Sequence, residues 1–151
     1  MSFKNFLEEN TPQESSPAVA AGVTVITGAT VNLSTLKAQK VTFLCHLDAV
    51  VNTGVAVLSC QISDDGSTWA APTAPIAADA TVTVTGVAGE LDNTYLVLEC
   101  VRPTKPYVRC LLTRTVANTS VHSITAFVQD QRSFAGANAE VSGSVVVDAA
   151  E

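Results

Sequence analysis

Apolar and polar side chains alternate with a period of two residues through the middle of this 151-residue chain. The alternation is strict in TVTVT (81–85), and every second side chain is apolar in VAVLSCQIS (55–63). Because successive side chains of a strand point to opposite faces, this period predicts β-strands that bury one face. Similar segments lie at 23–26, 29–33, 40–46, 95–101, 107–113 and 121–128.

Turn signals separate these segments at short intervals, for example the Asp-Gly pair at 65–66. About eight short strands without helical periodicity predict an all-β fold, an antiparallel β-sandwich that is jelly-roll-like. The pattern does not separate a jelly-roll strand order from an immunoglobulin-like one. The last strand has an ambiguous inward face, since Val121 and Phe127 compete with Ile124 and Val128.

All four cysteines fall on the apolar phase of the predicted strands. The predicted inward positions are Val41, Phe43, Cys45, Ala56, Leu58, Cys60, Ile62, Leu96, Leu98, Cys100, Val108, Cys110 and Leu112. No cysteine pair has the C-x-x-C spacing of zinc or redox sites, and a reducing cytoplasm keeps thiols reduced. We interpret the cysteines as buried core thiols, with a structural disulfide or a metal site as the alternatives.

The composition divides the chain into an N-terminal arm (1–20), a sandwich domain (21–129) and a C-terminal arm (130–151). Both arms contain too few apolar residues to fold alone. Their isolated apolar side chains are predicted to anchor on a partner: Phe3, Phe6, Leu7, Phe134, Val145, Val146 and Val147. We therefore expect extended arms whose deletion, at 1–18 or 131–151, weakens attachment to that partner and leaves the sandwich folded.

Charge and hydropathy disfavour several classes of partner. The net charge of −6 argues against nucleic-acid binding, which needs an excess of Lys and Arg. No run of 18 apolar residues predicts a membrane helix. The first 17 residues lack the apolar centre of a secretion signal, so we expect synthesis to end in a cytoplasm.

The chain contains two histidines, and neither has a catalytic setting in the sequence. Cys45 and His46 are neighbours on a predicted strand, so they point to opposite faces and form no local dyad. His46 and Asp48 share a face, and we expect them to pair at an exposed strand end. No glycine motif for phosphate and no EF-hand loop occurs. The sequence predicts no enzyme, no cofactor and no metal.

The stretch LECVRPTKPYVRCLLTR (98–114) holds four of the eight Lys and Arg residues of the chain. We interpret it as two strands of a hairpin, joined by the proline-containing connector RPTKP. Its basic cluster is either a solvated face or the contact for an acidic neighbour: Arg102, Lys105, Arg109 and Arg114. Trp69 either seals the end of the sandwich, stacks on a sugar ring or docks onto a partner. The predicted contact residues of this region are Trp69, Arg102, Lys105, Tyr107 and Arg109.

The segments QISDDGSTW and VRPTKPYVRCLLTR…ANTSVHSITAFV, with an Ala/Pro/Thr-rich stretch between them, resemble the capsid decoration or cement proteins of tailed bacteriophages. In that family a similar S-D-D-G-S-T-W turn precedes a K/R-Y-V-R strand and an alternating last strand. The resemblance covers residues 61–129. This chain differs in Pro106, where a basic residue often stands, and in its four cysteines.

The resemblance implies a non-enzymatic virion protein, made in the host cytoplasm, that binds the outer capsid surface. Such a protein joins neighbouring subunits of the major capsid protein. The family also implies a dimer or trimer and arms that reach adjacent subunits. The alternative function is a carbohydrate- or receptor-binding module of a phage tail or fibre, with Trp69 and Tyr107 as stacking platforms.

Overall fold

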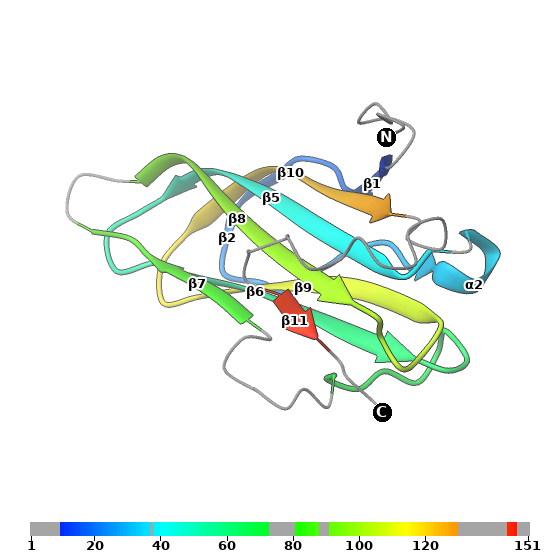
Figure 1. Ribbon diagram of the computed structural model, residues 1–151. Helices are drawn as coiled ribbons and strands as arrows, with labels where there is room; N and C mark the ends of the chain where they lie inside the picture. Colours follow the sequence, from blue (N-terminus) through cyan, green and yellow to red (C-terminus); the bar gives the residue numbers. More distant parts are fainter. Residues whose placement is uncertain (1–9, 37, 73–80, 88–90, 130–144, 148–151) are drawn as a thin grey trace.

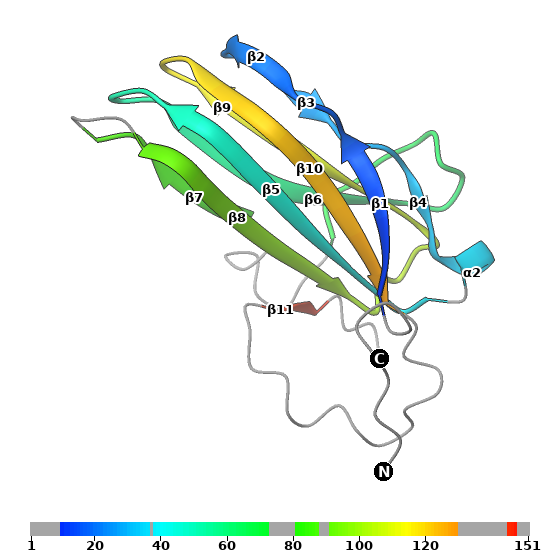
Figure 2. The ribbon, with the colours of Figure 1, turned by 90° about the horizontal axis from the view of Figure 1, so that it is seen from above.

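The computed structural model describes residues 10–36, 38–72, 81–87, 91–129 and 145–147. Two antiparallel sheets pack face to face in these residues, as Figures 1 and 2 show, which confirms the predicted all-β sandwich. One short helix, α2 (Leu33–Leu36), precedes the longest strands. In the described residues no helix is both long and apolar enough to cross a membrane.

The sheets are built from the predicted alternating segments and from short strands at the chain ends. Sheet A contains β1 (Asn10–Ser16), β2 (Val19–Gly22), β5 (Lys40–Val50), β8 (Leu91–Val101), β10 (Thr119–Gln129) and β11 (Val145–Val147). Sheet B contains β3 (Ile26–Thr27), β4 (Val31–Asn32), β6 (Val55–Ser63), β7 (Thr81–Thr85) and β9 (Tyr107–Thr115).

The strand order is that of a jelly roll. β1 and β2 follow one another along β10, and β3 and β4 follow one another along β9. With each pair taken as one interrupted strand, sheet A has the order β1/β2, β10, β5, β8, and sheet B has the order β3/β4, β9, β6, β7. In an immunoglobulin sandwich the last two strands are neighbours in one sheet, whereas β9 and β10 lie in different sheets. The alternative that the sequence left open is thereby settled.

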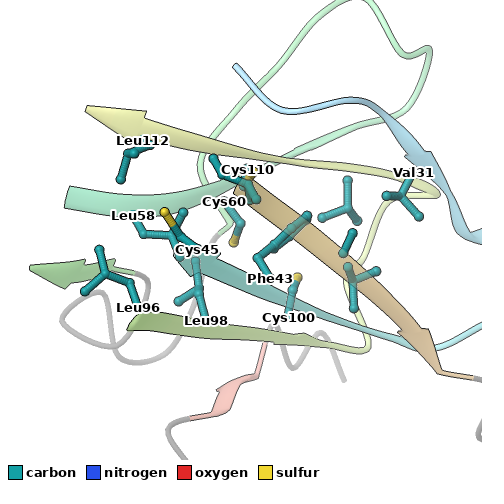
Figure 3. Close-up of a cluster of buried hydrophobic side chains, with 14 of the residues drawn as sticks. Val31, Phe43, Cys45, Leu58, Cys60, Leu96, Leu98, Cys100, Cys110 and Leu112 are labelled. Atoms are coloured by element: carbon teal, nitrogen blue, oxygen red, sulfur yellow. The ribbon is translucent and has the colours of Figure 1, made fainter. Parts of the chain in front are cut away.

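The core lies between the sheets and contains all the predicted inward positions. Figure 3 shows Phe43 and the four cysteines among leucines of both sheets and Val31. All four cysteines are buried and none forms a disulfide, so the interpretation as core thiols is confirmed and the disulfide alternative is wrong. Gly28 is required in this region, because a Cβ there would collide with Ser15 Oγ and Cys110 Sγ.

A β-bulge resolves the ambiguous face of β10. The register with β5 shifts on both sides of Val121. As a result Val121 and Ile124 are both buried although they lie three residues apart, and Phe127 is on the outer side.

The predicted hairpin at 98–114 is wrong. β8 pairs with β5 in sheet A, whereas β9 pairs with β6 in sheet B. The 102–106 connector therefore crosses from one sheet to the other. Both arrangements put the same alternate residues inside, so side-chain alternation alone does not distinguish them.

The sandwich begins earlier than the predicted boundary at residue 20. β1 pairs with β10 from Asn10 to Ser16, and Ser15 and Ser16 are buried. This polar segment gave no alternation signal because it is an edge strand held by backbone hydrogen bonds.

Near the C-terminal end, β11 adds to the free edge of β8 in parallel orientation. Phe3, Phe6, Leu7 and Phe134 lie outside the described residues.

Candidate interaction surface

A hydrogen-bonded turn follows β6 and positions the single tryptophan. The Asp65 carboxylate accepts the backbone N–H of Ser67 at 2.8 Å and of Thr68 at 2.7 Å, together with the Ser63 hydroxyl at 2.9 Å. These bonds, that from Thr68 foremost, hold the pKa of Asp65 well below its usual range. Gly66 takes a positive φ of 72°, which glycine adopts without strain. The turn thus has a defined shape set by its own side chains.

The Arg109 side chain stacks on Trp69 and is hydrogen-bonded to Gln61 of the neighbouring strand. The Arg109 guanidinium carbon lies 4.1 Å from the centre of the Trp69 ring. Arg109 also donates Nε–H and Nη2–H to the Gln61 Oε1, at 2.9 and 2.7 Å. Gln61 and Arg109 are direct partners in the β6–β9 ladder. The arginine is therefore held in place from two sides before any partner arrives.

Two further predicted contact residues border the same turn. Tyr107 pairs with Ser63 in the β6–β9 ladder, and its ring lies beside Gly66. The Lys105 ammonium forms a 2.8 Å ion pair with the Asp64 carboxylate. The structure therefore gathers Trp69, Lys105, Tyr107 and Arg109 around one turn, and we call these four residues the Trp69 cluster.

Arg102 lies next to this cluster on the connector between the sheets. It is exposed and has a positive φ of 48°. Arg102 and Lys105 line an open groove of about 600 Å³ between α2 and the 102–106 connector. Lys105 thus belongs to both the cluster and the groove, and Arg102 adds a second cation beside the connector.

Arg114 does not belong to this surface, contrary to the predicted basic cluster. It continues the inward phase of Val108, Cys110 and Leu112 and is fully buried. Its guanidinium donates to the carbonyls of Ala20 and Thr24, both at 2.9 Å, and of Thr119 at 2.6 Å. Burial lowers the pKa of Arg114 from its ordinary value. Arg114 therefore has a structural role: it acts as a clamp that holds the 20–24 segment and the start of β10 against β9.

The outer face of sheet A carries an aromatic group that sequence reasoning missed. The rings of His46 and Tyr95 stack with centroids 4.4 Å apart, and the His122 ring lies 4.9 Å from His46. Tyr95 is 57% exposed and the nearby Val97 is 46% exposed. The signal was present in YLVLECV, where Tyr95 and Val97 are apolar on the outward phase.

The expected pair of His46 and Asp48 is wrong. The His46 Nε2 lies 3.3 Å from the Asn93 Oδ1, and Asp48 accepts a hydrogen bond from the Ser120 hydroxyl at 3.1 Å. Within the described ranges, no three His, Cys, Asp or Glu side chains gather in a way that would hold a metal ion.

No protein-family model matches this sequence, and no curated protein is significantly similar to it.

Proposed function

We propose that this protein is a non-enzymatic cement protein of a phage capsid, which binds the outer shell and joins neighbouring subunits of the major capsid protein. The observation that carries this proposal is the Trp69 cluster. Tryptophan, tyrosine and arginine are the residues that contribute most to protein–protein binding energy. Here the Arg109 guanidinium is held by its stacking on Trp69 and its hydrogen bonds to Gln61, so these two side chains lose little freedom when a partner binds.

The charge of the cluster favours a partner with acidic groups. Arg109 in the cluster and Arg102 beside it stand on the outer side of a chain whose net charge is −6. Arginine binds carboxylates through two parallel hydrogen bonds, and its planar group stays charged at all relevant pH values. Weak contacts of this kind suffice on a shell because many copies bind a repeating surface.

Stabilisation of the shell follows from mass action. A protein that binds the assembled shell and not its free subunits shifts the equilibrium towards assembly. We therefore expect decorated shells to withstand heat better than bare ones. The measurement is the dissociation temperature of shells with and without saturating protein.

The alternative function, a glycan- or receptor-binding module, has weaker support from the geometry. A sugar stacks on an open aromatic face, and the Arg109 guanidinium covers one face of Trp69. A glycan array separates the two functions. Strong glycan binding that disappears in Trp69→Ala would favour the module.

The direct test is binding of the purified chain to undecorated shells of the phage that encodes it. Trp69→Ala removes the central aromatic residue, and we expect affinity to fall by about 30-fold, which corresponds to ~2 kcal/mol. Tyr95→Ala is the matched control, since Tyr95 is an exposed aromatic residue on the outer face of sheet A. Failure of the wild-type chain to bind shells would refute the proposed function.

A further inference from the structure

The groove between α2 and the 102–106 connector has a basic lining. Among the described residues that line it, Arg102 and Lys105 are charged and none is acidic. Its volume of about 600 Å³ falls within the range of sites that hold small ligands. A ligand that fits this groove should therefore carry carboxylates.

Arg102 is the cation of the groove that has no ion pair within the described residues. Lys105 already contacts the Asp64 carboxylate at 2.8 Å, whereas no carboxylate of the described residues reaches Arg102. Arg102 is exposed, and its φ is 48°. This conformation is uncommon for a residue other than glycine, and such backbone outliers concentrate at binding sites.

The end of β11 brings an acidic residue close to Arg102. β11 pairs with β8 in parallel, and its last residue, Val147, is opposite Val101 (Figures 1 and 2). Asp148 and Arg102 are the next residues of these two segments. Neighbouring strands lie about 4.8 Å apart and successive Cα atoms about 3.8 Å, so the Cα atoms of Asp148 and Arg102 are at most ~12 Å apart. The side chains of an arginine and an aspartate together bridge that distance.

The sequence that follows β11 has the same charge spacing as the connector. Residues 148–151 read Asp-Ala-Ala-Glu, so their two carboxylates stand three positions apart. Arg102 and Lys105 are also three positions apart, in the sequence Arg-Pro-Thr-Lys. The alanines between the carboxylates add no charge and little bulk. A parallel continuation of the two segments therefore places opposite charges side by side.

We propose that the groove is a binding site for an extended peptide with two carboxylates three residues apart, and that its occupant is the segment 148–151 of the same chain. Arginine binds a carboxylate through two parallel hydrogen bonds, so Arg102 holds Asp148. The Lys105 ammonium has three donors, so it holds Glu151 beside its existing ion pair. Exposed ion pairs are weak alone, but the connection to β11 gives the segment a high effective concentration at the groove.

The bound segment competes with an acidic partner for the same two cations. Under the proposed function, on which this consequence rests, the shell reaches Arg102 and Lys105 only in molecules whose groove is open. The apparent affinity for the shell is then reduced by the fraction of open molecules. The segment 148–151 thus acts as an internal competitor of the shell.

Asp130 is the nearest rival of Asp148 for Arg102. It follows the last residue of β10, Gln129, whose carbonyl accepts the Gln39 N–H at 3.3 Å. The Gln39 carbonyl in turn accepts the Arg102 N–H at 2.7 Å. Asp130→Asn and Asp148→Asn are therefore matched variants, since each removes one carboxylate near the groove and keeps the size of the side chain.

NMR spectroscopy of the full chain tests the occupant without any shell. The reporter is the Nε–H signal of the Arg102 guanidinium, which shifts when a carboxylate binds. We expect Asp148→Asn, and a chain that ends at Val147, to move this signal in the same direction. Asp130→Asn should leave it in place, as should Glu140→Gln, which removes another carboxylate of the same arm.

Two further readings of the same spectra identify the site. The backbone signals that change should be confined to residues 33–39 and 102–106, while those of β8 stay in place because β11 remains paired. A synthetic Asp-Ala-Ala-Glu peptide, added in excess, should return the Arg102 signal of the shortened chain towards its wild-type position. An Arg102 signal that Asp148→Asn leaves unchanged, or that Asp130→Asn moves instead, would overturn the assignment.

Crosslinking shows whether the segment belongs to the same molecule. A carbodiimide joins a lysine amine to a carboxylate in contact with it, so it should link Lys105 to Glu151. In a mixture of isotopically labelled and unlabelled chains, the linked peptides should be wholly labelled or wholly unlabelled. Peptides that combine the two forms would contradict the inference, because the occupant would then come from another copy.

Binding to shells tests the competition. The chain that ends at Val147 keeps β11, and we expect it to bind shells about threefold more tightly than the full chain. Glu140→Gln should bind like wild type. Equal or weaker binding of the shortened chain would contradict the competition and leave the proposed function intact. Absence of wild-type binding would instead refute the proposed function, and the NMR experiment alone would then decide on the groove.

Discussion

At the residue scale, the buried guanidinium of Arg114 ties its own strand β9 to two other pieces of chain. Its donors serve carbonyl oxygens of Ala20, Thr24 and Thr119, which belong to the β2–β3 segment and to β10. Removing a buried donor leaves its acceptors without partners, which costs more than the net energy of the bonds themselves.

Arg114→Met keeps the apolar stem and removes all the donors. We expect the free energy of unfolding to fall by about 3 kcal/mol, because the buried Thr119 carbonyl and the partly buried Ala20 and Thr24 carbonyls lose their donor. Urea denaturation followed by circular dichroism measures this change. Arg102→Met, at an exposed position, is the control and should stay within about 0.5 kcal/mol of wild type. Equal stability of the two variants would mean that Arg114 is no clamp.

Cys45 links the stability of the core to alkaline pH. Burial, with a smaller contribution from neighbouring Cys110, raises the pKa of Cys45 from 9.0 to about 12. The folded state thus keeps the thiol protonated while the unfolded state loses its proton above pH 9. Stability should be insensitive to this thiol below about pH 9 and should fall between pH 9 and 12. Denaturation at a series of pH values, with Cys45→Ala as the comparison, measures the difference.

At the residue scale, the sequence predicted the apolar core positions but not the burial of Arg114. The thirteen predicted inward positions could be found because their alternation is regular and their side chains are apolar. Arg114 occupies the next inward position after Leu112, yet its charge led to an exposed assignment. No local signal reveals the distant Ala20 and Thr24 carbonyls that accept hydrogen bonds from this buried guanidinium.

At the scale of elements, β1 covers the edge of sheet A. It pairs with β10 from Asn10 to Ser16, so β10 is not an edge strand at that side. This changes the expectation for N-terminal deletions. Removing residues 1–9 should leave the sandwich intact, whereas removing residues 1–18 strips β1 and exposes the backbone of β10.

The two deletions therefore form a matched pair. We expect the 1–18 deletion to lower the melting temperature by several degrees and to promote aggregation, because an unpaired strand edge binds other chains. The 1–9 deletion should melt like the full chain. Thermal denaturation with light scattering measures both effects. If the 1–18 deletion melts like the full chain, β1 contributes nothing to the fold.

The elements that escaped prediction share a physical cause. β1 is polar, so it shows no periodic pattern. The segments predicted at 23–26 and 29–33 do meet strands there, but β3 and β4 are only two residues long. The turn around Asp65 was predicted, since Asp-Gly pairs favour tight turns. The arrangement of Trp69 over Arg109 was not, because it depends on the β6–β9 register, which alternation leaves undetermined.

At the scale of the whole molecule, the jelly roll joins strands that are distant in sequence. β1 pairs with β10, and β5 pairs with both β8 and β10. Such long loops must close before their contacts form, so we expect refolding in milliseconds to seconds and not in microseconds. Stopped-flow fluorescence of Trp69 measures the rate, and a microsecond phase with full amplitude would contradict it. The refolding rate of Phe43→Ala, a variant of the buried core, is the comparison.

The four thiols buried between the sheets have a consequence for how the history of each copy can be read. Oxidants in the surroundings reach Cys45, Cys60, Cys100 or Cys110 only when the two sheets separate. A sulfinic or sulfonic acid found on one of them would be a permanent chemical record that this copy had once opened. Mass spectrometry of aged material would then count past unfolding events, copy by copy, long after each copy had refolded.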